Sequence, residues 1–68
     1  MKNRIREYRK SAKLSQEKLA KLCNVSRQTI NAIENDKYDP TLQLAFDLAR
    51  TLGVKVDELF LGGRKDAE

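Results

Sequence analysis

The sequence lacks histidine and tryptophan, and its 68 residues include only one cysteine and one proline. Without histidine, the commonest general base and metal ligand are missing, so we expect no enzyme activity, metal, cofactor or small-molecule ligand. Cys23 has no second cysteine to pair with, and we interpret it as a small core residue. No apolar run approaches the roughly 18 residues of a membrane span and no signal peptide is recognisable, so we expect a cytoplasmic protein with no membrane partner.

The charge distribution is uneven along a chain that is 40% hydrophobic and 35% charged. Residues 1–27 carry nine basic and two acidic side chains, whereas residues 28–68 carry five basic and eight acidic ones. The composition predicts one small globular domain, and the charge asymmetry favours a face that binds a polyanion such as phosphate. The alternative is that the basic residues only keep the protein solvated.

Residues 14–35 contain two short amphipathic helical patterns joined by a tight polar turn. Ser15 and Ser26 stand at N-cap positions, and each is flanked by an apolar pair that can form a hydrophobic staple. Between them, Asn24 tolerates the left-handed backbone with which a helix ends. Two capped helices separated by one such residue are typical of a helix-turn-helix.

The apolar spacing predicts five helices, at residues 2–13, 16–23, 27–34, 42–52 and 54–61. We expect Thr41 to cap the fourth helix and Gly53 to end it, and residues 62–68 to form a charged tail outside the domain of residues 1–61. The residues expected to face inward are Ile5, Tyr8, Arg9 and Ala12; Leu19, Ala20, Leu22 and Cys23; Ile30, Ile33 and Glu34; and Leu42, Ala45, Leu48, Ala49 and Leu52.

The opposite face of the third predicted helix is rich in amides and almost uncharged. It comprises Gln28, Thr29, Asn31, Ala32 and Asn35, with Arg27 at its start. Amide side chains suit the edge of adenine in the DNA major groove, arginine suits guanine, and a threonine methyl suits that of thymine. An ordinary solvent-exposed face would carry lysine and glutamate, so we interpret this one as base-reading. The alternative is a merely polar helix.

The segment NDKYDP after this helix has turn chemistry, and Pro40 disfavours helix at Asp39. Lys37 and Tyr38 at its tip are donors that can reach a DNA phosphate. Tyr38 has an equal alternative, which is to pack over the end of the third helix.

Two further segments are more apolar than one small core requires. Leu44 and Phe46 widen the apolar arc of the fourth helix, and Leu59, Phe60 and Leu61 follow one another at the end of the fifth. A single short helix buries only part of such a set. We therefore expect a seam with a second copy of the chain, formed by Leu44, Phe46, Phe60 and Leu61.

The stretches SQEKLAKLCNVSRQTINAIENDKYDPTL and LARTLGVKVDELF resemble the Cro/repressor (Xre-type) family of prokaryotic phage-repressor-like regulators, over residues 3–61. The resemblance implies an all-α, compact five-helix bundle of the lambda-repressor-like kind, which binds double-stranded DNA, usually as a homodimer. The family's phosphate-binding glutamine falls on Gln16, and its arginine–glutamate pair falls on Arg9 and Glu34. The sequence departs from the family pattern at Asn24, where glycine is common, and at Lys55, where a serine-type cap is usual.

The function expected from both lines of reasoning is a transcriptional regulator, in the simplest case a repressor, with its third helix in the major groove of a pseudopalindromic operator. The base-reading residues would be Arg27, Gln28, Thr29 and Asn31. The phosphate-binding residues would be Ser15, Gln16, Asn35, Lys37 and Tyr38. The alternative is an antitoxin-like protein-interaction module for which DNA binding is secondary.

Overall fold

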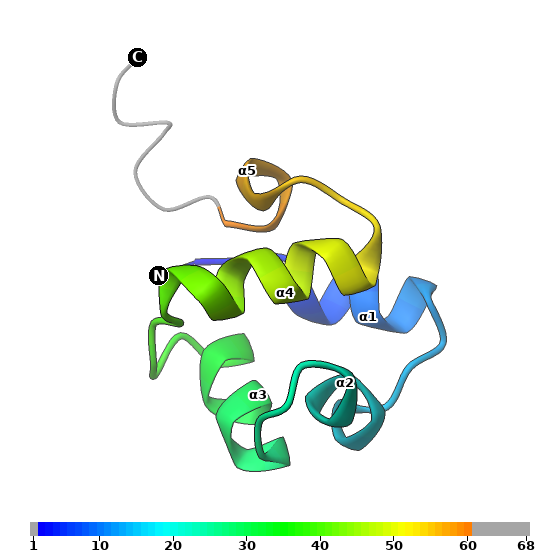
Figure 1. The fold of residues 1–68 in the computed structure, drawn as a ribbon, viewed down its shortest axis with the longest axis vertical. Coiled ribbons are helices and arrows are strands. Elements are labelled where there is room, and N and C mark those ends of the chain that lie inside the picture. Colours follow the sequence, from blue (N-terminus) through cyan, green and yellow to red (C-terminus); the bar gives the residue numbers. More distant parts are fainter. Residues whose placement is uncertain (1, 61–68) are drawn as a thin grey trace.

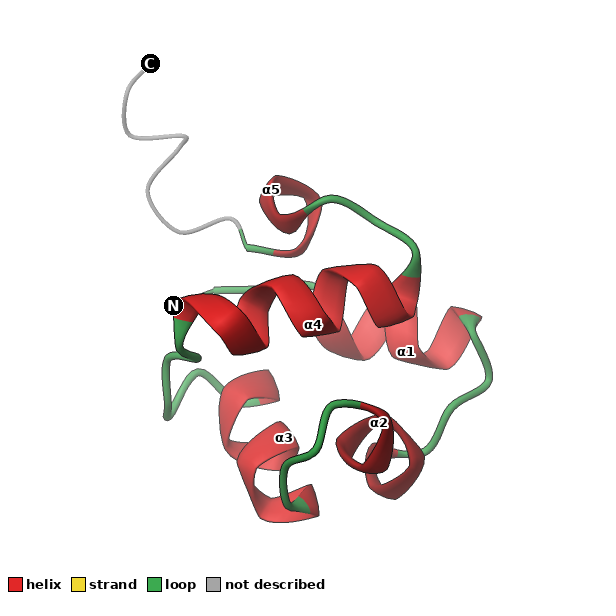
Figure 2. Cartoon of the chain, in the orientation of Figure 1, coloured by secondary structure: helices red, strands yellow, loops and turns green. Residues whose placement is uncertain are grey.

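The structure, a computed structural model, describes residues 2–60, and these form five α-helices. Helix α1 spans Ile5–Ser11, α2 Gln16–Leu22, α3 Arg27–Glu34, α4 Leu42–Leu52 and α5 Val56–Leu59. Helix α4 crosses the domain, with α2 and α3 on one side of it, α5 on the other and α1 behind (Figure 1). The predicted all-α, five-helix fold is confirmed, and within residues 2–60 the extended pairing is a single bridge between Asn3 and Phe60 (Figure 2).

All three predicted N-caps are present. The side-chain oxygens of Ser15, Ser26 and Thr41 accept hydrogen bonds from the backbone N–H three residues later, at 3.0, 3.1 and 3.2 Å. Each bond satisfies a donor that the first helical turn leaves unpaired. The starts of α2, α3 and α4 are therefore set locally by the sequence, and all three coincide with the predicted positions.

Left-handed residues separate the helices. Asn24 adopts φ 60° in the turn between α2 and α3, and Gly53 adopts φ 73° after α4, both as predicted. Lys13 and Asp36 also have positive φ, at 61°, before α2 and after α3. Neither was predicted; aspartate adopts this conformation occasionally and lysine rarely.

The core lies between the helices and combines residues of the predicted stripes with three that were not predicted to face inward, Leu44, Leu59 and Phe60. Its members are Ile5, Leu19, Ala20, Cys23, Ile30, Ile33, Leu44, Ala45, Leu48, Ala49, Leu59 and Phe60. The prediction is wrong for two leucines that were expected to face inward: Leu22 is 51% exposed and Leu42 is 71% exposed. Leu22 falls outside the arc occupied by Leu19, Ala20 and Cys23, and Leu42 lies in the first turn of α4.

Both ends of the domain are less helical than predicted. Helix α1 begins at Ile5 rather than residue 2 and leaves Ala12 exposed, and α5 has only four residues. Lys55, the N-cap of α5, makes no side-chain cap bond, but its backbone N–H donates to the Glu58 carboxylate at 2.7 Å. The backbone N–H of Arg4 donates to the Leu59 carbonyl at 2.8 Å, so α5 is tied to the start of the chain.

Candidate nucleic-acid interface

The outward side of α3 brings the four predicted base-reading residues onto one surface. Arg27, Gln28 and Asn31 are exposed and Thr29 is half-buried, its hydroxyl 3.0 Å from that of Ser26. On the opposite side, the side chains of Ile30 and Ile33 are almost completely buried. The helix is therefore held by its aliphatic side, and its polar side faces solvent.

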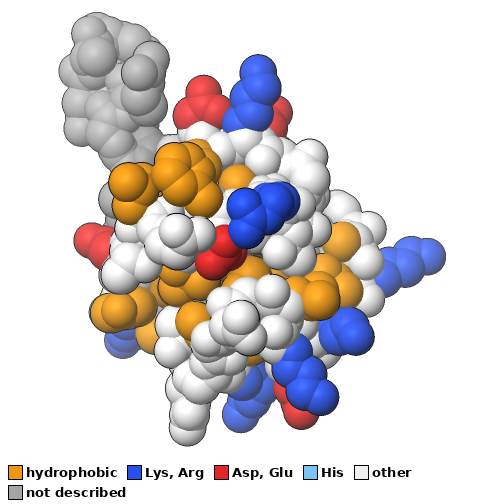
Figure 3. Space-filling view, in the orientation of Figure 1, with side chains coloured by type: hydrophobic (Ala, Val, Ile, Leu, Met, Phe, Trp, Pro, Cys, Tyr) orange, Lys and Arg blue, Asp and Glu red, His pale blue; other side chains and the backbone are white. Residues whose placement is uncertain are grey.

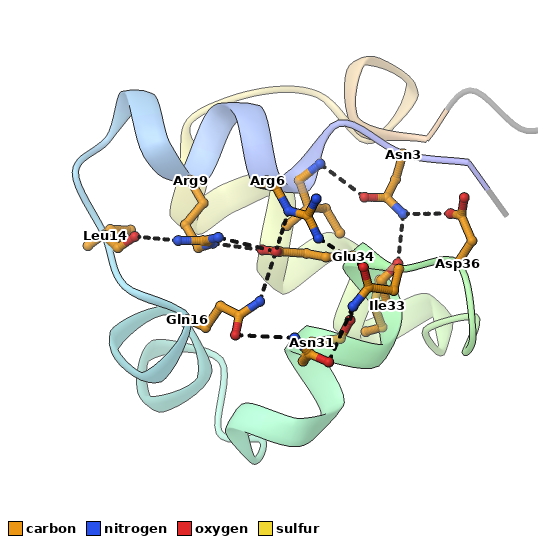
Figure 4. Close-up of polar contacts among 11 residues, drawn as sticks. Asn3, Arg6, Arg9, Leu14, Gln16, Asn31, Ile33, Glu34 and Asp36 are labelled. Carbon is orange, nitrogen blue, oxygen red and sulfur yellow. Dashed lines mark hydrogen bonds and ion pairs between the residues drawn. The ribbon is translucent and has the colours of Figure 1, made fainter.

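The central feature behind this surface is the carboxylate of Glu34, whose side chain is fully buried. Arg9 donates to it from Nε at 2.7 Å and from Nη2 at 3.2 Å, and also donates from Nη1 to the Leu14 carbonyl at 2.9 Å. The predicted Arg9–Glu34 pair is thus present in the structure, and it connects α1, the start of α2 and the end of α3 (Figure 4).

Two more donors reach the same carboxylate. Gln16 donates from Nε2 at 3.0 Å and Arg6 donates from Nε at 3.3 Å. Burial raises the pKa of the Glu34 carboxyl, but hydrogen bonds from Arg9, Gln16 and Arg6 and the charge of Arg9 outweigh burial and hold the pKa below its ordinary value. Glu34 is therefore a buried anion that is stabilised by donors from two other helices.

Of the predicted phosphate-binding residues, Ser15 and Gln16 lie together at the start of α2. Gln16 points toward Asn31 of α3, and Asn31 Nδ2 lies 3.5 Å from Gln16 Oε1 (Figure 4). Asn35, the C-cap of α3, directs Nδ2 at the carbonyl and Oδ1 of Asn31, at 2.9 and 3.3 Å. A phosphate contact from this residue would compete with these bonds for its amide hydrogens.

The loop after α3 places the aromatic side chain of Tyr38 beside the candidate interface. Lys37 and Tyr38 are both exposed, and Tyr38 lines a shallow, mostly apolar hollow with Gln28, Thr29 and Ala32. Tyr38 therefore lies beside the middle of the outward side of α3, and its ring adds apolar surface next to the predicted base-reading residues.

Arg6 and Asn3 are contributors that the sequence reasoning did not select. Arg6 donates from Nη2 to Asn35 Oδ1 at 2.9 Å in addition to its bond with Glu34. Asn3 donates from Nδ2 to the Ile33 carbonyl at 2.8 Å and to Asp36 at 3.2 Å. The available signal for Arg6 was its position three residues before Arg9, which places the two on neighbouring parts of the helix surface. Nothing in the sequence pointed to Asn3.

The apolar surface lies on the other side of the domain, over α4 and α5. Phe46 is 48% exposed, and Phe60 lines two hollows, one with Phe46 and one with Leu42. Hydrophobic side chains reach the surface over these helices, where lysine and arginine side chains also lie (Figure 3). The assignment of Leu44 and Phe60 to an intermolecular seam is corrected, because they are 7% and 9% exposed and pack in the core. Leu61 lies outside the described residues.

Among residues 2–60, no cluster of three or more cysteine or acidic side chains is placed to hold a metal ion. None of the helices in that range is long and apolar enough to cross a membrane. Cys23 is buried, and its Sγ lies 3.7 Å from the Thr51 hydroxyl; burial raises the pKa of its thiol.

Comparison with known proteins identifies related sequences. The sequence model of the helix-turn-helix family matches residues 5–59. An HTH-type transcriptional regulator of Methanocaldococcus jannaschii is 54% identical over 61 residues, which are 90% of this chain and 92% of that protein. The immunity repressor protein of Bacillus phage phi105 is 39% identical over 56 residues, covering 82% of this chain and 39% of that protein.

Solved structures share the same arrangement of helices. The restriction-modification controller protein C.AhdI from Aeromonas hydrophila matches with a TM-score of 0.78 and 35% identity, over 84% of this chain and 86% of that one. The P22 c2 repressor protein, solved in complex with a synthetic operator, matches with a TM-score of 0.77 and 31% identity, over 79% and 82%.

Proposed function

The chain belongs to the helix-turn-helix family, and from that premise we propose that it is a sequence-specific DNA-binding transcriptional regulator. The observation that carries this proposal is the outward side of α3, where Arg27, Gln28 and Asn31 are exposed over a buried aliphatic side. An α-helix fits the major groove, and these side-chain types match the donors and acceptors of base edges there. Gln28 and Asn31 would read adenine, and Arg27 a guanine or a phosphate.

Phosphate contacts on both sides of the recognition helix would set the register of the protein on the duplex. Ser15 accepts a backbone bond at its Oγ and retains its hydroxyl hydrogen, and Gln16 retains a second amide hydrogen beyond the one given to Glu34. Lys37 and Tyr38, in the loop after α3, are both exposed. Asn35 would join them in competition with its bonds to Asn31.

The regulator would act as a homodimer that places two copies of α3 in successive major grooves, with half-sites about 34 Å apart. What supports this part is the apolar surface of α4 and α5, where Phe46 and the hollows beside Phe60 lie away from the amide-rich side of α3. A protein of this kind would repress transcription by occupying a promoter, and the similarity to a phage immunity repressor supports that sign of regulation.

The test is a selection of bound duplexes from a random pool, followed by competition binding at several salt concentrations. We expect an enriched pseudopalindrome with half-sites one helical turn apart, and an affinity that falls steeply with salt because counterions are released. Equal competition by duplexes of every sequence would refute specific binding. Enrichment of a single, unrepeated half-site would retain the binding function but refute the dimer.

A further inference from the structure

Five polar side chains from three consecutive helical segments form a closed hydrogen-bonded ring behind the recognition surface (Figure 4). Its members are Arg6 of α1, Gln16 of α2, and Asn31, Glu34 and the cap residue Asn35 of α3. Arg6 donates to Asn35 at 2.9 Å, and Asn35 donates to Asn31 at 3.3 Å. Asn31 in turn donates to Gln16 at 3.5 Å, and Gln16 donates to Glu34 at 3.0 Å. A direct bond from Arg6 to Glu34, at 3.3 Å, closes the ring.

The ring has a direction. Arg6 is a cation that only donates, Glu34 is an anion that only accepts, and each of the three amides between them accepts at oxygen and donates at nitrogen. Rotating any one amide by 180° would set N–H against N–H on one side and oxygen against oxygen on the other. The two charged ends therefore determine which way each amide faces, and bonds aligned in this way reinforce one another.

The orientation of Asn31 has a direct consequence for base reading. The ring uses one amide hydrogen and one oxygen lone pair of Asn31, which leaves one hydrogen and one lone pair on this exposed side chain. Adenine offers one acceptor, N7, and one donor, the N6 amino group, at its major-groove edge. An Asn31 amide that is already held in one orientation presents a donor to N7 and an acceptor to N6. It therefore loses less rotational entropy when it binds adenine.

We propose that Arg6, which lies outside the helix-turn-helix unit, is a positioning residue that sets base discrimination by Asn31 through this ring. The proposal rests on the proposed function, because it requires Asn31 to read a base. Arg6 is 49% exposed, so it has a rival role as a direct phosphate contact. The two roles differ in what they change: a lost phosphate contact weakens binding to every sequence, whereas a lost orientation weakens only the discrimination at one base pair.

The decisive variant is Arg6→Lys, which keeps the charge but replaces a planar fork that bonds two residues with a single ammonium group. The base pair read by Asn31 is first identified in the selected operator, as the position at which Asn31→Ala loses its preference. At that position we expect Arg6→Lys to lose about fivefold in discrimination, the worth of roughly one net hydrogen bond. Affinity for random duplex and the salt dependence should stay as in the wild type.

A second variant opens the ring at another member. Asn35→Ala should lower discrimination at the same base pair, and the double variant Arg6→Lys/Asn35→Ala should lose no more than either single one, because both changes break one unit. Lys10→Met, which removes a charge from the exposed side of the same helix, is the matched control and should leave discrimination unchanged. Circular dichroism melting establishes that each variant is folded before binding is measured.

The other outcomes overturn the proposal and separate it from the proposed function. Unchanged discrimination in folded Arg6→Lys would refute it, as would equal weakening on selected and random duplexes with a smaller salt slope. If Asn31→Ala lost preference at no base pair, Asn31 would not be a reader and the ring would have nothing to position, although specific binding could stand. Only a wild-type protein that selects no sequence would refute the proposed function itself.

Discussion

Glu34→Ala should be the most destabilising single substitution in the polar part of this domain. It removes a fully buried carboxylate that accepts two hydrogen bonds from Arg9 and one each from Gln16 and Arg6. Arg9, with 11% of its side chain exposed, would keep its charge and lose its ionic partner. Deleting one member of a buried ion pair costs about 3–5 kcal/mol. A domain of 68 residues has a total stability of only about 3–10 kcal/mol, so the substitution should remove a large share of it.

Urea denaturation followed by circular dichroism at one protein concentration measures this loss. Asp47→Ala is the matched control. It also removes a carboxylate from an ion pair, but this pair joins Asp47 to Arg50 within α4 and lies at the surface, with Arg50 73% exposed. Removing that surface pair should cost less than about 1 kcal/mol. A Glu34→Ala midpoint close to that of Asp47→Ala would refute the reasoning, because it would mean that water or another group satisfies Arg9 at little cost.

Three further changes test other parts of the molecule. Gln28→Ala should lose about 1–3 kcal/mol on the selected operator and much less on random duplex, as measured by competition binding; equal losses would make Gln28 a backbone contact. Because the folded pKa of Glu34 is lowered, its stabilisation is complete above the ordinary carboxyl pKa of about 4.3 and is lost as pH falls through the lowered value. Urea midpoints between pH 7 and 3 should therefore fall more steeply for wild type than for Glu34→Gln, and parallel curves would contradict this. Phe46→Glu should halve the mass measured by light scattering at micromolar concentration while leaving helicity intact; an unchanged mass would exclude this surface from the dimer.

Local chemistry explains why the middle of the chain could be predicted from sequence. Ser15, Ser26 and Thr41 each fix a helix start through one side-chain bond to the adjacent turn, and Asn24 can enter the left-handed region by itself. Interactions over three or four residues leave a direct mark on the sequence. Glu34 was also predictable as an inward residue, because its position in α3 follows from helix periodicity alone.

Long-range interactions explain what was missed. The partners of Asn3 and Arg6 in these bonds lie 28 to 33 residues away, and no pattern in the surrounding sequence indicates them. Leu42 has the spacing of a core residue, but whether the first turn of α4 is covered depends on how far the neighbouring helices extend. Periodicity gives the direction of a side chain around its helix, and it contains no information about the length of the partner surface.

The ring also divides the recognition surface into two parts that should tolerate substitution differently. Arg27 and Gln28 lie exposed in the first turn of α3, outside the ring, so changing them should alter the preferred operator with little effect on folding. Asn31 shares bonds with Gln16 and Asn35, and through Gln16 it is connected to the buried carboxylate of Glu34. A new side chain at position 31 would change the proposed base reading and leave amides of the ring without a partner. New specificities in this scaffold should therefore arise first at Arg27 and Gln28, while Asn31 can change only together with the residues that hold it.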